Sequence, residues 1–500
     1  MSSTEGISEE AHVVVVGGGP GGSTLATLIA MRGHRVVLLE KEKFPRWQIG
    51  ESLLPSTVHG VCRLTGVADE LAKAGFTKKK GGTMRWGANP EPWTFSFSAS
   101  PRITSETSHA YQVERSRFDQ ILLDHARHTG VDVREQHAVV DVIDGDGDGR
   151  VHGVTYTDAE GSRGTIRARY VVDASGNKSR IHQRVGATRE YSEFFRSLAL
   201  FGYFENGKRL PEPNSGNILC AAFDSGWFWY IPLSPTLTSV GAVVRRELAD
   251  KIQGDPEEAF TSLIAECPLI TEYLQGATRV TEGQYGQLRV RKDYSYANTR
   301  FWRPGMALIG DAACFIDPIF SSGVHLATYG ALLAARSINS VLAGTLDEDT
   351  AFREFERRYR REYSAFHDFL VSFYNLHVNE TSYFWSAKKV TDSNSSALES
   401  FVSLVGGVSS GEAALATPKT LAERYKSQSS EFAAAVDELA GSEEPSILPL
   451  MRAQVVRDAM QQGANEQIRA HLGSGIGPET PLFDGGLIAS PDGLSWSPPA

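Results

Sequence analysis

Cysteine is scarce in this chain. The 500 residues include four cysteines, and none belongs to a CxxC pair or to a spacing typical of zinc ligands. A disulfide framework or a structural zinc centre is therefore not expected, and no metal site is predicted. We expect all four to be reduced and packed in the interior: Cys62, Cys220, Cys267 and Cys314.

Long apolar runs are missing as well. No run reaches the length needed to cross a bilayer, and the first ten residues lack the basic and apolar pattern of a secretory signal. We therefore expect a cytoplasmic protein without a membrane partner. A net charge of -10 disfavours nucleic-acid binding. Repeats at solenoid periods are absent, and 41% hydrophobic residues suffice to fill more than one core.

A dinucleotide-binding motif follows the first apolar run. The segment HVVVVGGGPGG places three glycines in GxGxxG spacing between a predicted strand and a predicted helix. A second apolar run, RVVLLE, ends in an acidic residue at the distance where a carboxylate meets an adenosine ribose. A glycine-rich turn without a ligand is the weaker alternative. The residues predicted here to bind a cofactor are Gly17, Gly19, Pro20, Gly22, Glu40 and Lys41.

A second anion-binding segment spans residues 310–325, GDAACFIDPIFSSGVH. Gly310 and Asp311 follow a short predicted strand and are placed to meet the ribityl and phosphate groups of a cofactor. Further on, Ser321, Ser322 and Gly323 directly precede a helix predicted over residues 324–343, where uncovered backbone amides favour an anion. These residues alone do not choose between a phosphate, a carboxylate and a halide.

Several blocks favour FAD over NAD. They resemble, in the expected order over about three hundred residues, the FAD-binding segments of flavin monooxygenases of the hydroxybenzoate hydroxylase type. The resemblance implies an α/β fold: a Rossmann-like FAD-binding domain, an inserted β-sheet substrate domain and a helical C-terminal region. It adds these cofactor-binding residues: Arg46 and Ser52 in FPRWQIGESLLP, Arg115 in VERSRFDQ, Asp173 in YVVDASG, then Gly310, Asp311 and Gly323.

Three further motifs sharpen the resemblance, which covers residues 12–390. GWFWYIP carries Trp227 and Trp229 in the Trp-x-Trp-x-Ile-Pro pattern of flavin-dependent halogenases, and FIDPIFSSG fits their FxxPxxSxG pattern. FTKKKGG matches the spacing around their catalytic lysine and selects Lys79. The chain therefore resembles the flavin-dependent halogenases. Core packing is the alternative for the tryptophan pair, and a solvated charge is the alternative for the lysine.

The halogenase resemblance implies a division of labour. Reduced FAD and O2 would oxidise a bound chloride or bromide to hypohalous acid, while Trp227 and Trp229 keep the organic substrate away. Lys79 would receive the oxidant at the end of a tunnel and direct it to one ring carbon. The predicted halide-binding residues are Pro318, Ser321, Ser322 and Gly323, and the predicted tunnel-lining residues are Phe320, Tyr383 and Phe384. Core packing is an equal alternative for Tyr383 and Phe384.

One departure from a subgroup bears on the substrate. Tryptophan halogenases place a glutamate where Phe320 stands. The substrate is therefore expected to be a small aromatic activated by its own electrons, a phenol or a pyrrole. It would be either free or tethered to an acyl or peptidyl carrier protein. The alternatives are an aromatic hydroxylase and a non-catalytic flavoprotein that presents a carrier partner.

The absence of a second GxGxxG suggests that a separate NAD(P)H-dependent flavin reductase supplies the reduced flavin. Five arginines in residues 352–362 could receive an acidic carrier protein, or could be ion-paired on a solvated helix. No compact structure is expected in the Gly/Pro/Ser-rich tail after residue 473. The expected divisions are FAD-binding parts at 1–80, 113–190 and 281–345, substrate-sheet parts at 81–112 and 191–280, and a helical region at 346–500.

Overall fold

The first sheet of the protein is a parallel sheet built from apolar strands. The computed structural model describes residues 8–86, 91–145, 147–292, 295–375, 397–415 and 481–499. Five parallel strands stand in the order β20, β10, β1, β2, β7, and β19 is added antiparallel at the β20 edge. Both faces of its centre are covered, so β2 and the ends of β1 and β10 are continuous buried apolar runs, whereas the edge strand β7 is polar. Their bounds are β1 Ser8–Val16, β2 Val36–Glu40, β7 Asp132–Glu135, β10 Arg163–Asp173, β19 Trp302–Arg303 and β20 Met306–Leu308.

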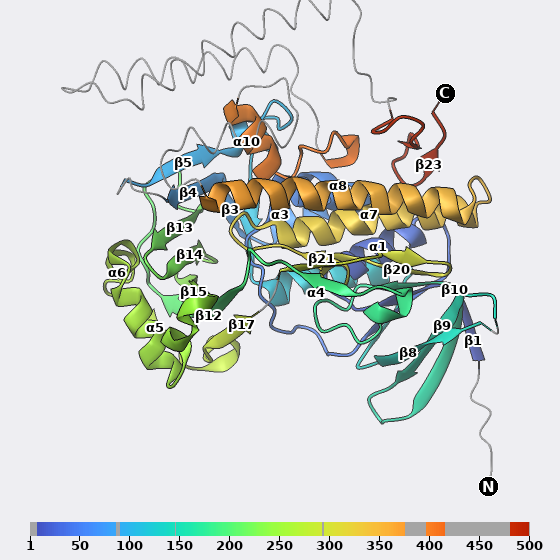
Figure 1. Ribbon diagram of the computed structural model, residues 1–500, viewed down its shortest axis with the longest axis horizontal. Coiled ribbons are helices and arrows are strands. Elements are labelled where there is room, and N and C mark those ends of the chain that lie inside the picture. The colour runs from blue at the N-terminus through green and yellow to red at the C-terminus, as the bar shows by residue number, and fades with distance from the viewer. Residues whose placement is uncertain are drawn as a thin grey trace, which may run out of the picture.

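Long helices cover this sheet (Figure 1). Helix α7 packs against α1 on one side and α8 on the other, and α4 also contacts α1. The helix predicted over 324–343 begins two residues earlier than expected, at Ser322. Strands β8 and β9 pair antiparallel at the edge of this sheet. The bounds are α1 Pro20–Ala30, α4 Arg115–His128, α7 Ser322–Leu342, α8 Glu348–Asn375, β8 Ala138–Asp144 and β9 Val151–Thr157.

A second sheet takes strands from distant parts of the chain. Its order is β16, β12, β15, β14, β13, β4, β5, with β17 paired to β12. Helices α5 and α6 cover one face, where Phe228 and Tyr230 of β14 pack with Phe260. Trp227 and Trp229 point to the opposite face and join the main core, as the period of two predicts. The bounds are β4 Gly81–Arg85, β5 Trp93–Ser96, β12 Ser197–Glu205, β13 Ile218–Phe223, β14 Gly226–Pro232, β15 Leu237–Arg245, β16 Thr278–Arg279, β17 Arg289–Lys292, α5 Pro256–Ala265 and α6 Pro268–Tyr273.

Two small strand groups join the sheets. A two-stranded ribbon pairs β3 with β6, although residues 110–112 had been expected in the substrate sheet. A three-stranded group has the order β11, β18, β21. No helix among the described residues is both long and apolar enough to cross a membrane. The bounds are β3 Thr77–Lys79, β6 Ala110–Gln112, β11 Arg189–Tyr191, β18 Tyr296–Asn298 and β21 Cys314–Phe315.

The expectation that the tail lacks compact structure is wrong for residues 481–499. There, strands β22 (Ile488–Ala489) and β23 (Trp496–Ser497) form a hairpin. The indole of Trp496 is buried and donates to the Ser337 hydroxyl at 2.9 Å. A few apolar side chains in a Gly/Pro/Ser-rich segment were enough to anchor it, because α7 and α8 offer a surface on which to bury them.

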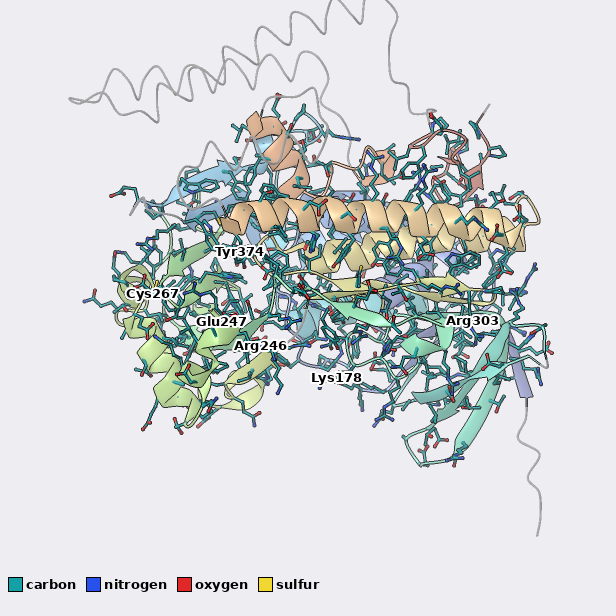
Figure 2. All side chains as sticks on the ribbon, in the orientation of Figure 1. Lys178, Arg246, Glu247, Cys267, Arg303 and Tyr374 are labelled. Atoms are coloured by element: carbon teal, nitrogen blue, oxygen red, sulfur yellow. The ribbon has the colours of Figure 1, made fainter. Side chains whose placement is uncertain are left out.

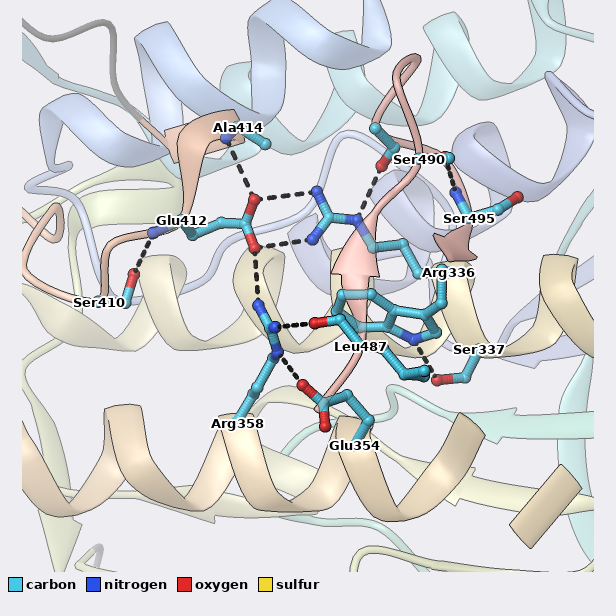
Figure 3. Close-up of polar contacts among 12 residues, drawn as sticks. Arg336, Ser337, Glu354, Arg358, Ser410, Glu412, Ala414, Leu487, Ser490 and Ser495 are labelled. Atoms are coloured by element: carbon cyan, nitrogen blue, oxygen red, sulfur yellow. Dashed lines mark hydrogen bonds and ion pairs between the residues drawn. The ribbon is translucent and has the colours of Figure 1, made fainter. Parts of the chain in front are cut away.

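The arginines of α8 were expected either to receive a carrier protein or to lie on a solvated helix, and neither expectation describes all of them. Arg358 is buried, and it and Arg336 of α7 both donate to the carboxylate of Glu412 (Figure 3). The two guanidinium groups lower the pKa of Glu412 to about 2 against the opposing effect of burial. Arg353 forms an exposed ion pair with Asp349, as expected for a solvated helix. Part of α8 is therefore held in the interior by buried ion pairs, and only part of the helix is a solvated basic face.

From these buried ion pairs we predict a large loss of stability when Glu412 is replaced. Glu412→Ala would leave the buried Arg336 guanidinium without its carboxylate, which typically costs about 3–5 kcal/mol, whereas Arg358 would keep its pair with Glu354. Equilibrium unfolding in urea measures the change. Asp349→Ala, which breaks the exposed pair with Arg353, is the matched control and should unfold like the wild type. Equal stability of the two variants would contradict the assignment.

Candidate active site

The predicted cofactor glycines meet at the carboxyl end of β1. Gly17 has φ of +102°, and a Cβ there would lie 2.7 Å from the Ala174 carbonyl oxygen, so only glycine fits. A Cβ on Gly22 would lie 1.9 Å from the Gly17 oxygen. Pro20 and Gly19 stand at the start of α1. These backbone requirements keep the helix N-terminus bare beside the sheet, where a pyrophosphate binds in folds of this type.

Glu40 ends β2 next to this turn. One of its oxygens accepts from the Gly18 amide at 2.7 Å, and the other accepts from the Glu42 amide. Its neighbour Lys41 is exposed and lies 4.0 Å from Glu42. Glu40 thus lies where the sequence predicts, at the glycine turn, whereas Lys41 makes no polar contact with that turn among the described residues.

Arg46 and Arg115 are held by a carboxylate that sequence reasoning missed. Arg115 donates to both oxygens of the buried Asp119 and to the Ile49 carbonyl at 2.6 Å. Arg46 donates to the same carboxylate at 2.9 Å. The spacing of Arg115 and Asp119, four residues apart on α4, was the available signal. These contacts fix the strap, residues 46–55, against α4.

Polar groups without a protein partner surround the strap and the Asp311 turn. Among the described residues, the Ser52 hydroxyl and two nitrogens of the Arg189 guanidinium are buried without a hydrogen-bond partner. Arg189 also lies 4.0 Å from the Tyr296 ring, whose hydroxyl donates to the Asp311 carbonyl. Unsatisfied buried donors are costly unless a ligand completes them. They fit the phosphates and hydroxyls of FAD, and Arg189 was not foreseen from the sequence.

The two predicted cofactor aspartates are buried in different ways. Asp173 accepts from the hydroxyls of Ser175 and Ser179, and burial raises its pKa despite these bonds. Asp173 therefore binds the residues that directly follow β10. Burial also raises the pKa of Asp311, against the opposing charges of nearby arginines that include Arg115 and Arg189. Gly310, with φ of +60°, makes the turn before it.

The halide loop, residues 318–323, brings together all four predicted halide-binding residues. Ser321 occupies the left-handed region at φ of +60° and stands just before α7, and its amide donates to the Pro318 carbonyl. The Ser322 hydroxyl is buried and has no partner among the described residues. A Cβ on Gly323 would lie 2.8 Å from the Phe315 ring. The loop therefore presents the bare N-terminus of a long helix, where an anion is favoured.

Asp317 is a second carboxylate that sequence reasoning missed, although it stands in the halide-loop motif. One of its oxygens accepts from the Ile319 amide at 3.0 Å and from the Tyr374 hydroxyl at 3.1 Å. The other oxygen is buried without a partner among the described residues. Burial raises the pKa of Asp317 to about 7. Figure 2 shows Tyr374 at the end of α8 that lies over the second sheet.

Lys79 is the buried member of the KKK run, as the motif spacing selects. Lys78 and Lys80 are exposed, whereas Lys79 is 2% exposed. Its ammonium donates to the Leu53 carbonyl of the strap at 3.1 Å and to the Ser321 hydroxyl of the halide loop at 3.4 Å. No carboxylate among the described residues forms an ion pair with it. Burial lowers the pKa of Lys79 to about 7, opposed by Cys220.

A line of aromatic rings passes beside the strap. The rings of Trp227 and Trp229 lie 6.2 Å apart between centroids, and Trp86 lies 6.3 Å from Trp227. On the other side Phe201 lies 5.4 Å from Trp229 and 6.0 Å from Trp47 of the strap. We call these five residues the aromatic wall. The bulk of Trp229 is accommodated by a glycine on the next strand, Gly241, where a Cβ would lie 2.2 Å from the indole.

The wall ends in a third buried acid that the sequence did not reveal. The Trp47 indole donates to the Tyr203 hydroxyl, which donates to Glu51 at 2.8 Å. Burial raises the pKa of Glu51 to about 7.

Only one of the three predicted tunnel residues, Phe320, lies among the described residues. Phe320 is buried against Phe369, Phe373 and Phe401, the last from α10 (Ala397–Val405). This packing puts an aromatic group where a carboxylate was noted to be missing. Tyr383 and Phe384 lie outside the described residues. All four cysteines are free and buried, which confirms the packing prediction.

The fold and this site define an FAD-dependent oxidoreductase of the hydroxybenzoate hydroxylase type. The tryptophan halogenase family profile matches residues 12–105 and 99–437. The chain belongs to that family, and it is an enzyme, a flavin-dependent halogenase that uses FAD as FADH2, O2 and a halide.

Named relatives and solved structures agree with this assignment. A tryptophan 2-halogenase from Chondromyces crocatus is 36% identical over 76% of this chain and 70% of its own length. A flavin-dependent halogenase from Penicillium aethiopicum is 35% identical over 72% and 70%. The structure of the myxobacterial chondrochloren halogenase CndH is 48% identical, with a TM-score of 0.74 over 98% of this chain and 100% of that one. The halogenase CmlS is 28% identical, with a TM-score of 0.71 over 98% and 84%.

The buried ammonium predicts a pH-dependent penalty on stability. The pKa of Lys79 is about 7 in the folded protein and near its ordinary value of 10.5 when unfolded. The penalty is therefore complete below pH 7 and is relieved as the pH rises from 7 to 10.5. Lys79→Met, which removes the charge, should raise the melting temperature more at pH 6 than at pH 10. A gain independent of pH would contradict the lowered pKa.

Proposed function

We propose that this halogenase chlorinates an electron-rich aromatic ring, phenolic or pyrrolic, in natural-product biosynthesis, with Lys79 as the catalytic residue. The observation that carries the proposal is the placement of the Lys79 ammonium, which is buried between the strap and the halide loop. A surface lysine would be a solvated charge, whereas this one has a single oxygen neighbour from each segment. Its lowered pKa suits a group that must exchange protons near neutral pH.

The cofactor residues would be the glycines of the β1 turn, Glu40, the strap and Arg189. Bound FAD, reduced by a separate NAD(P)H-dependent reductase, supplies with O2 the two-electron oxidation of chloride to hypochlorous acid. The amides of Ser322 and Gly323 hold the chloride through the bare end of α7. The aromatic wall keeps the organic substrate away from the site of oxidation, so that only the small oxidant passes to Lys79.

Two forms of halogen transfer fit a lysine with this pKa. The ammonium can donate a hydrogen bond to hypochlorous acid, so that the ring attacks chlorine and releases water as it loses a proton. Alternatively the neutral amine takes chlorine to give a chloramine and water, and the ring then takes chlorine and returns its proton to the amine. In both forms the lysine selects the carbon that is attacked.

The substrate class rests on Phe320 and its surroundings. The position holds a phenyl ring packed among other phenyl rings, so no carboxylate at this point would help to deprotonate an indole-type intermediate. A phenol or a pyrrole activates its own ring and does not need that carboxylate. The ring is free or is carried as a thioester on an acyl or peptidyl carrier protein.

Substitution of Lys79 tests its role. Lys79→Met should bind FAD normally, as followed by flavin absorbance, yet lose halogenation by about 100-fold or more, in the range of acid–base groups. Lys78→Met, which changes the exposed neighbour, is the matched control and should remain active. Substantial product from the Lys79 variant would refute the proposed role.

Product analysis tests the reaction and the substrate class. The enzyme is incubated with flavin reductase, NADH, FAD, O2 and either chloride or bromide, with a phenol and a pyrrole offered free and as pantetheine thioesters. Mass spectrometry should find a halogen isotope pattern with chloride. A gain of oxygen alone would instead establish an aromatic hydroxylase.

A further inference from the structure

Behind the halide loop lies a chain of three side chains that the proposed chemistry does not use. Ser56 Oγ lies 2.9 Å from His325 Nδ1, and His325 Nε2 lies 2.8 Å from Glu362 Oε1. Ser56 and His325 are 0% exposed and Glu362 is 2% exposed. A carboxylate only accepts, so the Glu362 contact places a proton on Nε2, and Nδ1 shares the second hydrogen bond with the Ser56 hydroxyl.

The same three residue types form a nucleophile, a base and an orienting acid in hydrolases. That function does not fit here, because the serine hydroxyl has no open side. A Cβ on Gly407 would lie 2.2 Å from Ser56 Oγ and 2.9 Å from His325 Nδ1. The backbone of Gly407 therefore occupies the space that a scissile group would need. The chain holds segments of the protein together and does not meet a substrate.

The segments that it holds are those that hold Lys79. Ser56 follows three residues after Leu53, whose carbonyl accepts from the Lys79 ammonium, and His325 follows four residues after Ser321, whose hydroxyl is the other acceptor. We propose that the Ser56–His325–Glu362 clamp sets the distance between these two acceptors and so positions the Lys79 ammonium for halogen transfer. Its three members are positioning residues, and the inference rests on the proposed function of Lys79.

Each end of the clamp is fixed by a different part of the fold. Glu362 belongs to α8, and His325 lies in the first turn of α7 just after the halide loop. Ser56 begins the short helix Ser56–Val61 directly after the strap, and its amide donates to the Gly406 carbonyl at 3.2 Å. Through the clamp, the end of the strap is held in place by α7, α8 and residues 397–415. Precise placement matters because small displacements of catalytic groups cost large factors in rate.

The test measures the titration of Lys79 directly. The enzyme is labelled with 13C at the ε carbon of lysine, and the Lys79 resonance is assigned as the one missing from Lys79→Met. In Ser56→Ala the two acceptors should separate and admit water, so that the pKa of Lys79 rises by about one unit towards its ordinary value. Halogenation in a single turnover should fall by about tenfold or more, while FAD binding is retained.

Ser337→Ala is the matched control. Ser337 lies on α7, the helix that carries His325, and is fully buried like Ser56. Its hydroxyl donates to the Ala351 carbonyl and accepts from the Trp496 indole. Its loss should lower stability without moving the Lys79 titration. If Ser56→Ala does not fold, Ser56→Cys, which keeps the side-chain size but is a weak donor, is measured in its place.

The outcomes separate this inference from the proposed function. An unchanged Lys79 titration in the folded Ser56 variant would overturn the clamp, and so would an equal shift in Ser337→Ala. Neither result bears on whether Lys79 is catalytic. Full halogenation by Lys79→Met would overturn the proposed function, whereas the resonance would still show whether the clamp positions the ammonium.

Discussion

The burial of one ammonium group that pairs with no carboxylate of the described residues is the constraint around which the site is arranged. A charged amine removed from water is expensive unless its hydrogen bonds are satisfied. Two of them are satisfied by neutral oxygens, the Leu53 carbonyl and the Ser321 hydroxyl, and no carboxylate in the described part of the chain compensates the charge. The lowered pKa of Lys79 is the direct result. A carboxylate at this point would stabilise the ammonium and would hold its proton too tightly for the exchange that we propose.

That arrangement requires three distant segments to meet at one point. The ribbon of β3 and β6 carries the lysine, the strap brings one acceptor, and the start of α7 brings the other. The strap is fixed by the Arg46–Asp119 and Arg115–Asp119 contacts, and α7 is fixed against α1 and α8. Glu412 ties α7 to α8 through its buried pairs with Arg336 and Arg358, and the Gly/Pro/Ser-rich tail contributes the Gly493 and Leu487 carbonyls, which accept from the same two arginines. Remote electrostatic contacts therefore support the helices that frame the site.

The aromatic wall shows how packing serves separation. Alternate residues of β14 point to opposite faces, so that Trp227 and Trp229 face the main core while Phe228 and Tyr230 pack under α5 and α6. Stacked and tilted rings fill space with large apolar surfaces, and such pairs stabilise the fold beyond the area they bury. The same rings suit a partition that a large substrate cannot pass.

The sequence by itself determined the FAD-binding turn, the parallel sheet, the halide-loop motif and the choice of Lys79 within the KKK run. These are local patterns, in which spacing along the chain dictates backbone geometry. Only the tertiary structure decided which polar groups face one another: Asp119 with Arg46 and Arg115, Arg189 with the Asp311 turn, Asp317 with Tyr374, and Ser56 with His325 and Glu362. It also decided that residues 481–499 are ordered on α7 and α8. Burial and long-range pairing create these features, and neither can be read from neighbouring residues in the chain.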